Sequence, residues 1–293
     1  MNYSKVFYNG GRLKLLWRIL IFITLLIGLI LPLLLIDNSI QQFFGAVLVL
    51  LLALYISSKY IDKRDFKVYG IIFKREMFIN FLIGITIGIF SVIIILLIGK
   101  ALGLLSISKL PNQLKISVLF LFVSKMFLVA ILEETFFRGY LFTNFYEGIK
   151  FDKISKKLAI AIALVFSSFL FGLAHFFNNN ASTLSIALLT INGIVWCIPF
   201  IISKNLGLSI GMHLAWNFTQ TLVGFTMSGN VAKNAIFSIK NEGSVILTGG
   251  NYGPEAGILG VMGFVIMLIL SLIYLNCINK TNQAFEVKNS KFQ

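Results

Sequence analysis

The sequence predicts an all-α fold, a polytopic membrane helix bundle of about eight transmembrane helices that forms a single integral membrane domain over residues 1–293. Hydrophobic residues make up 58% of the chain and charged residues 12%, whereas about a quarter of the residues of a soluble domain are charged. The apolar residues also gather in runs of about 20, the length that crosses a bilayer as a helix. The net charge of +14 comes from basic residues in short loops, so we expect a lipid bilayer and no nucleic acid as partner.

Eight apolar runs are long enough to be spanning helices. The first follows a basic start, but it is too long for the core of a signal peptide and lacks a small-residue cleavage site, so we expect it to be retained. In order, the expected spans are 17–36, 43–61, 79–102, 117–141, 158–176, 184–202, 206–226 and 257–277.

Basic residues are unevenly shared between alternate loops. They concentrate in the loops 59–75 and 150–157 and in the tail, which carries Lys280, Lys288 and Lys291. By the positive-inside rule this predicts that both termini are cytoplasmic. The heavy use of Ile, Lys, Asn and Phe is typical of an AT-rich genome, which favours a bacterial cell membrane.

Glycine marks two further features. Gly84 with Gly88 and Gly207 with Gly211 have the small-xxx-small spacing that lets membrane helices approach closely. The longest outer segment, 228–254, contains turn-forming glycines and is predicted to be a lid or a plain loop.

Three charged residues interrupt the fourth expected span, namely Glu133, Glu134 and Arg138. A charged side chain at mid-bilayer costs roughly 2.5 to 3.5 kcal/mol, so this cluster requires partners, water or a function. Glu134 and Arg138 are four residues apart and share a helix face, which predicts an ion pair. Glu133 is turned about 100° away and is expected to point into the bundle.

Both histidines of the chain fall in expected spans, His175 in the fifth and His213 in the seventh. His213 and Asn217 share a helix face and can donate hydrogen bonds to an oxyanion. Phe171 lies one turn before His175, where it either packs on the imidazole or belongs to the core. If Glu133 and His175 face the same polar cavity as this pair, they can activate a water for amide hydrolysis. Glu133, His175 and His213 are equally the ligand set of some catalytic zinc sites, and both chemistries stay open.

Three ordered segments carry a family resemblance. Glu133-Glu134-Thr135-Phe136-Phe137-Arg138, Phe171-Gly172-Leu173-Ala174-His175 and His213-Leu214-Ala215-Trp216-Asn217 resemble the E-E-x-x-x-R, F-x-x-x-H and H-x-x-x-N/D motifs of the CAAX protease and bacteriocin-processing (CPBP, or Abi) family of intramembrane proteases. The motif-bearing core spans about 117–226, and the loop 62–70 is similar to a less specific segment before the core of the family.

The resemblance implies an intramembrane endopeptidase that cuts membrane-associated peptides or proteins. It assigns water activation to Glu133 and His175, oxyanion stabilisation to His213 and Asn217, and supporting roles to Glu134, Arg138 and Phe171. Many members are called metalloproteases, but we favour a glutamate-dependent mechanism that requires no cofactor, with zinc as the alternative.

Two rival functions and one geometric difficulty remain. Gly207-Leu208-Ser209-Ile210-Gly211 matches the nucleophile pattern of serine hydrolases, so a rhomboid-like protease using Ser209 is an alternative, although no histidine follows on a later helix. Some relatives are scaffolds or regulators, so a non-proteolytic membrane scaffold or regulator is the second alternative function. A span over 117–141 also predicts different depths for Glu133 and His175, unless the fourth helix is longer or the helices tilt.

Overall fold

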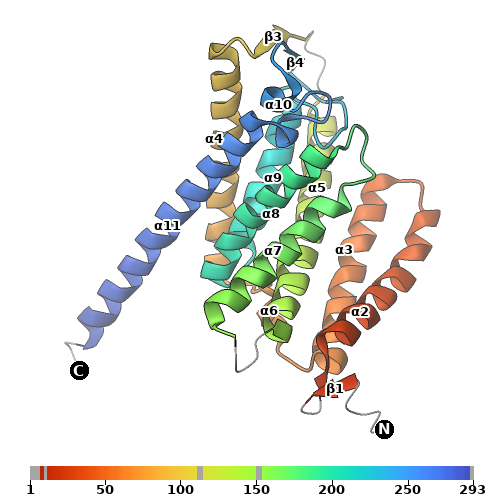
Figure 1. Ribbon diagram of the computed structural model, residues 1–293, viewed down its shortest axis with the longest axis vertical. Helices are drawn as coiled ribbons and strands as arrows, with labels where there is room; N and C mark the ends of the chain where they lie inside the picture. The colour runs from red at the N-terminus through yellow and green to blue at the C-terminus, as the bar shows by residue number, and fades with distance from the viewer. Residues whose placement is uncertain (1–6, 10–11, 111–114, 150–153, 291–293) are drawn as a thin grey trace.

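The computed structural model describes residues 7–9, 12–110, 115–149 and 154–290, with side chains up to residue 278. Of the lysines used above, Lys150, Lys153 and Lys291 lie outside the described residues, and the side chains of Lys280 and Lys288 do too. The described part is a bundle of long helices with two small two-stranded antiparallel sheets at its ends (Figure 1), which confirms the all-α membrane fold.

The helices follow one another with short connections. The long ones are α2 (Leu15–Ile30), α3 (Ser39–Ile56), α4 (Arg75–Ala101), α5 (Ile116–Glu133), α7 (Lys156–Ala174), α8 (Thr183–Ser203), α9 (Gly207–Leu222) and α11 (Ile258–Ser290). Shorter helical pieces are η1 (Leu31–Leu35), η2 (Ser57–Ile61), η3 (Phe66–Tyr69), η4 (Glu134–Phe142), α6 (Thr143–Ile149), α10 (Val245–Thr248) and η5 (Pro254–Ala256). Strands β1 (Tyr8–Asn9) and β2 (Arg12–Leu13) pair at one end, and β3 (Leu105–Lys109) and β4 (Phe237–Asn241) pair at the other.

Seven helical stretches of the described chain are long and apolar enough to cross a membrane. They are Leu15–Leu35, Ser39–Ile61, Arg75–Ala101, Ile116–Ile149, Lys156–Ala174, Thr183–Ser203 and Ile258–Ile278. The remaining expected span, 206–226, which is the seventh in order, is α9. This helix has only 16 residues, all of them buried except Phe218 and Leu222. It is therefore an internal helix that the other helices shield from lipid.

Helix α9 packs against α4 at backbone distance, as the glycine spacing predicts. A Cβ on Gly211 would lie 2.2 Å from the carbonyl oxygen of Phe81, and one on Gly84 would lie 2.4 Å from that of Leu208. Only glycine permits this approach, which fixes the depth of the residues that α9 carries.

The fourth span is longer than expected, because α5, η4 and α6 form one continuous helix from Ile116 to Ile149. Its middle part, η4, has π-helical hydrogen bonding over nine residues. At 1.5 Å per residue, Glu133 lies about 24 Å from the end at Ile149, and His175 lies about 28 Å from the start of α7 at Lys156. The longer helix therefore removes the expected difference in depth.

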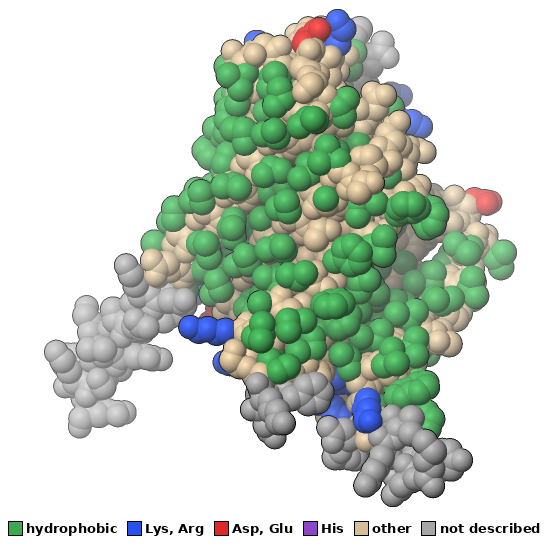
Figure 2. All heavy atoms as spheres, viewed as in Figure 1, with side chains coloured by type: hydrophobic (Ala, Val, Ile, Leu, Met, Phe, Trp, Pro, Cys, Tyr) green, Lys and Arg blue, Asp and Glu red, His purple; other side chains and the backbone are tan. Residues whose placement is uncertain are grey.

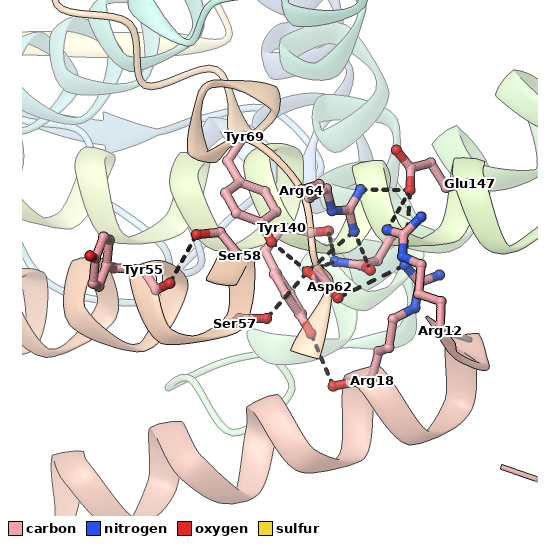
Figure 3. A network of polar contacts seen from close by, with 11 residues as sticks. Arg12, Arg18, Tyr55, Ser57, Ser58, Asp62, Arg64, Tyr69, Tyr140 and Glu147 are labelled. Carbon is pink, nitrogen blue, oxygen red and sulfur yellow. Dashed lines mark hydrogen bonds and ion pairs between the residues drawn. The ribbon is translucent and has the colours of Figure 1, made fainter. Parts of the chain in front are cut away.

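A buried polar network fixes the end of this helix (Figure 3). Asp62 accepts hydrogen bonds from Tyr69 and from Asn144 (3.2 Å), and it pairs with Arg64 at 3.2 Å. Glu147 in turn pairs with Arg64 at 2.9 Å, and also with Arg12 at 2.9 Å. These contacts join the N-terminal segment, the 57–70 connection and α6. The polar side chains of α6 therefore have partners, and the helix extends through them instead of ending before them.

Both ends of the described chain lie at the same end of the bundle (Figure 1). Between the two ends, the face seen in Figure 2 is mostly apolar, and Lys and Arg side chains gather towards the ends. This distribution agrees with an integral membrane protein.

Candidate functional site

The four residues proposed from the motifs line one cavity. Glu133 on α5, His175 at the end of α7, and His213 with Asn217 on α9 all face a space of about 680 Å³. Volumes of about 300–1,000 Å³ are typical of sites for small molecules. Three helices thus bring a carboxylate, two imidazoles and a carboxamide to a common space.

Glu133 lies between the two histidines. Its Oε2 is 3.9 Å from Nε2 of His175 and 3.8 Å from Nε2 of His213. This oxygen has no hydrogen-bond partner in the described chain. Distances near 4 Å are too long for direct hydrogen bonds, but a water between the three groups can bridge them.

Hydrogen bonds orient each imidazole through Nδ1. Nδ1 of His175 lies 2.8 Å from the carbonyl oxygen of Phe171, one turn earlier. Nδ1 of His213 lies 2.7 Å from Oε1 of Glu134. Because a carbonyl oxygen only accepts, Nδ1 of His175 carries the proton, and its Nε2 presents a lone pair to Glu133 when the ring is neutral.

Glu134 is completely buried and has two partners. Its Oε1 pairs with Nη1 of Arg138 at 3.1 Å, the expected i,i+4 contact, and also accepts the His213 hydrogen bond. The expected ion pair is therefore present, but the sequence did not indicate that Glu134 also orients His213.

Aromatic rings hold the cationic and imidazole groups from the opposite side. The Arg138 guanidinium lies 4.2 Å from the ring centroid of Phe171 and 5.7 Å from that of Trp196. His213 stacks on Trp196 at 4.2 Å between ring centroids, and Phe171 is 4.9 Å from His175. Phe171 thus contacts the ring of His175 and also belongs to the core.

Ser209 lies away from this arrangement. It is fully buried and donates a hydrogen bond of 2.7 Å to the carbonyl oxygen of Trp196. It is absent from the cavity lining. The geometry therefore gives no support to the serine alternative.

The donor chemistry around Glu133 resembles that of a metal site, since metal-binding histidines commonly donate their second ring N–H to a carboxylate or carbonyl, as His213 and His175 do here. However, no three His, Cys, Asp or Glu side chains of the described residues are placed to hold a metal ion. We therefore assign no step of the reaction to a metal.

The segment 228–254, expected to be a lid or a plain loop, begins at the cavity. Met227, Ser228 and Asn230 line it, within a tight turn closed by paired backbone hydrogen bonds between Met227 and Asn230. Both central residues have positive φ, 46° at Ser228 and 83° at Gly229. A Cβ on Gly229 would lie 1.8 Å from the carbonyl oxygen of Asn179, so the turn packs directly on the segment after His175.

Glu255 in η5 is a cavity residue that the sequence did not indicate. Its carboxylate accepts from the backbone N–H of Ser228 at 2.8 Å and faces the hydroxyl of Ser228 at 3.3 Å. The carbonyl oxygen of Ser228 accepts from Asn178 at 3.1 Å, and the N–H of Asn178 donates to the carbonyl of His175 at 3.1 Å. Burial raises the pKa of Glu255, and the hydrogen bonds from Ser228 partly offset this. Glu255 therefore connects the turn of 227–230 to the turn that carries His175.

Lys125 is the second cavity residue that sequence reasoning missed. It lies on α5, two turns before Glu133, and lines the same cavity, with its ammonium group 5.1 Å from the ring centroid of Phe43. No ion pair of Lys125 occurs in the described part of the chain, so its charge is available to an anionic group in the cavity.

One comparison with known proteins covers the segment that carries this site. Residues 115–219 match the family model described as Type II CAAX prenyl endopeptidase Rce1-like. No curated protein and no solved structure matches the chain. The matched segment includes α5, η4, α7, α8 and most of α9, and therefore Glu133, His175, His213 and Asn217. The resemblance seen in the motifs is confirmed: through residues 115–219 this chain is similar to the Rce1-like type II CAAX prenyl endopeptidase family.

Proposed function

We propose that this protein is an intramembrane endopeptidase that hydrolyses a peptide bond in membrane-associated peptides or proteins, with Glu133 as the group that activates water. The observation that carries the proposal is the single cavity in which Glu133 lies within 4 Å of both histidines. The family similarity supports the same class of reaction.

In the proposed reaction a water lies between Glu133 and His175. Glu133 accepts a proton from it while the oxygen attacks the scissile carbonyl carbon, and the carbonyl oxygen becomes an oxyanion. The lone pair on Nε2 of His175 accepts the second hydrogen bond of the water and orients it. The proton held by Glu133 then passes to the leaving amine as the C–N bond breaks.

His213 and Asn217 are proposed to stabilise the oxyanion. Nδ1 of His213 already donates to Glu134, so donation from Nε2 requires the doubly protonated ring. This charge state is balanced locally, because the imidazolium and Arg138 together offset the carboxylates of Glu133 and Glu134.

We further propose that both termini are cytoplasmic in a bacterial cell membrane. The two ends of the described chain lie at the same end of the bundle (Figure 1), which fits an even number of passes when α9 is counted with the seven long apolar stretches. In this orientation the tight turn of 227–230 and Glu255 cover the outer side of the cavity.

The test compares purified wild type with Glu133→Gln on a library of membrane-anchored peptides. Removing a general base typically lowers the rate by 10²- to 10⁴-fold. Glu76→Gln is the matched control, because Glu76 is exposed on the first turn of α4 and does not line the cavity. Full activity in Glu133→Gln would refute the proposal.

Three further arms separate the alternatives. Labelling by a serine-directed probe that disappears in Ser209→Ala would support the serine protease. Activity lost with a chelator and restored by zinc would support a metal on Glu133, His175 and His213. Rescue of a cellular phenotype by both wild type and Glu133→Gln, without cleavage by either, would support a scaffold.

A further inference from the structure

A second cavity, of about 640 Å³, lies on another side of the helix that carries Glu133. Its wall is almost entirely apolar and comes mainly from α3, α4 and α5, with smaller contributions from η4, α9 and the connection before α4. Representative lining residues are Val47 and Leu51 on α3, Phe78 and Phe81 on α4, and Phe127 and Ile131 on α5. Phe78 is 61% exposed, so the cavity is a groove open to the surroundings of the bundle. We call it the α3–α4–α5 groove.

The groove has two basic residues at one end. Lys74 is the N-cap residue of α4 and Arg75 is its first residue; both are exposed and line the groove. Neither forms an ion pair within the described chain. The first turn of α4 also lacks a side-chain cap, and uncapped N–H groups at a helix start favour an anion. The neighbouring Glu76 is not part of the lining.

We propose that the α3–α4–α5 groove binds an anionic phospholipid, with one acyl chain along the apolar wall and the headgroup phosphate at Lys74 and Arg75. The groove runs from Arg75 to Phe81, about 9 Å along α4, so it takes the part of a lipid next to its headgroup. Each basic residue beside a membrane contributes about 1 kcal/mol to the attraction of anionic lipids. A lipid with a neutral headgroup lacks this contribution.

Thr135 is a further observation that points to a ligand. Its side chain is fully buried and lines the groove, and its hydroxyl has no partner in the described chain. A lipid presents ester carbonyl oxygens close to its phosphate, and these accept a hydrogen bond from a hydroxyl. A buried hydroxyl without a partner is costly, so such a ligand satisfies a group that the protein leaves unpaired.

The position of Thr135 relates the groove to the catalytic helix. Thr135 follows Glu134 directly in η4. One side of η4 therefore borders the groove through Thr135, and another side carries Glu134 with its contacts to Arg138 and His213. A lipid in the groove would pack against the segment that holds Glu134 and stabilise it. The proposal does not depend on peptide hydrolysis.

The test measures lipid binding to the purified protein in neutral detergent. Phosphatidylglycerol and phosphatidylcholine with the same acyl chains are titrated, and binding is followed by native mass spectrometry and by the shift in Tm. We expect phosphatidylglycerol to bind more tightly. Lys74→Gln with Arg75→Gln should weaken its binding about thirtyfold, roughly fivefold per basic residue. Lys156→Gln with Lys157→Gln, at the start of α7, is the control that should leave binding unchanged.

Thr135→Val keeps the shape of the side chain and removes the hydroxyl, and it should weaken binding a fewfold. Glu133→Gln should bind lipid like wild type, which separates this proposal from the proposed reaction. Equal binding of the two lipids, or unchanged binding in the Lys74 and Arg75 variant, would overturn the proposal. Binding of an acylated peptide in the groove in preference to phosphatidylglycerol would instead assign it to the lipid anchor of a substrate.

Discussion

Glu134 makes two contacts through one oxygen, with Arg138 at 3.1 Å and with Nδ1 of His213 at 2.7 Å, and a double-mutant cycle can separate them. Glu134→Gln leaves the guanidinium of Arg138 buried without its carboxylate. Losing one partner of a buried ion pair costs about 3 to 5 kcal/mol, which corresponds to a decrease in Tm on the order of 10 °C. Adding Arg138→Gln removes the uncompensated charge, so we expect the double variant to regain part of this stability.

Activity should not return with stability. In the double variant His213 faces an amide instead of a carboxylate, so the doubly protonated ring that we propose for oxyanion stabilisation loses its counter-charge. We expect at least tenfold lower peptide cleavage per folded molecule, measured alongside thermal unfolding in the same detergent. A double variant that is no more stable than Glu134→Gln would contradict the ion-pair argument. Full activity in the double variant would contradict a role of Glu134 in charging His213.

Three other predictions concern packing, the contact of Glu255 with the turn of 227–230, and the substrate. Gly211→Ala places a Cβ 2.2 Å from a backbone oxygen of α4 and should lower Tm, whereas Gly28→Ala, with no atom within 4 Å, should not. Burial raises the pKa of Glu255 in the folded protein. The contribution of this carboxyl group to the free energy of unfolding is therefore complete below about pH 4, where an unfolded glutamate titrates. It is lost as the pH rises through the folded-state pKa. Melting curves over a pH series should show this loss in wild type, and Glu255→Gln should remove it. Lys125→Gln should raise KM severalfold for peptides with a carboxylate near the scissile bond and leave KM for uncharged peptides unchanged.

The sequence indicated the parts of the site that depend on local helical geometry. The pair of Glu134 and Arg138 follows from an i,i+4 spacing, and the close approach of α9 and α4 follows from paired glycines. The spacing of His213 and Asn217 likewise placed both on one face of α9, where both line the cavity. Each of these contacts is set within one helix or by the absence of a side chain, so a single sequence can reveal it.

Contacts that depend on distant segments were out of reach. Glu255 lies in a glycine-rich stretch with no motif, and only the fold brings it to Ser228. The fourth helix continues to Ile149 because Asp62 and Arg64, far away in the sequence, satisfy the polar side chains of Asn144 and Glu147. Lys125 falls in an apolar run, where nothing in the pattern distinguishes a cavity-facing lysine from one that extends to the membrane surface.

The position of His213 changes the interpretation of the two adjacent glutamates. Helical geometry alone separates them, with Glu134 paired to Arg138 and Glu133 free to act. In the structure His213 lies between them, with Nδ1 at 2.7 Å from Glu134 and Nε2 at 3.8 Å from Glu133. The imidazole therefore links the supporting carboxylate to the proposed catalytic one, and a change at Glu134 reaches Glu133 through a single ring. Adjacent positions on one helix thus place the two carboxylates on the two nitrogens of one imidazole on another helix.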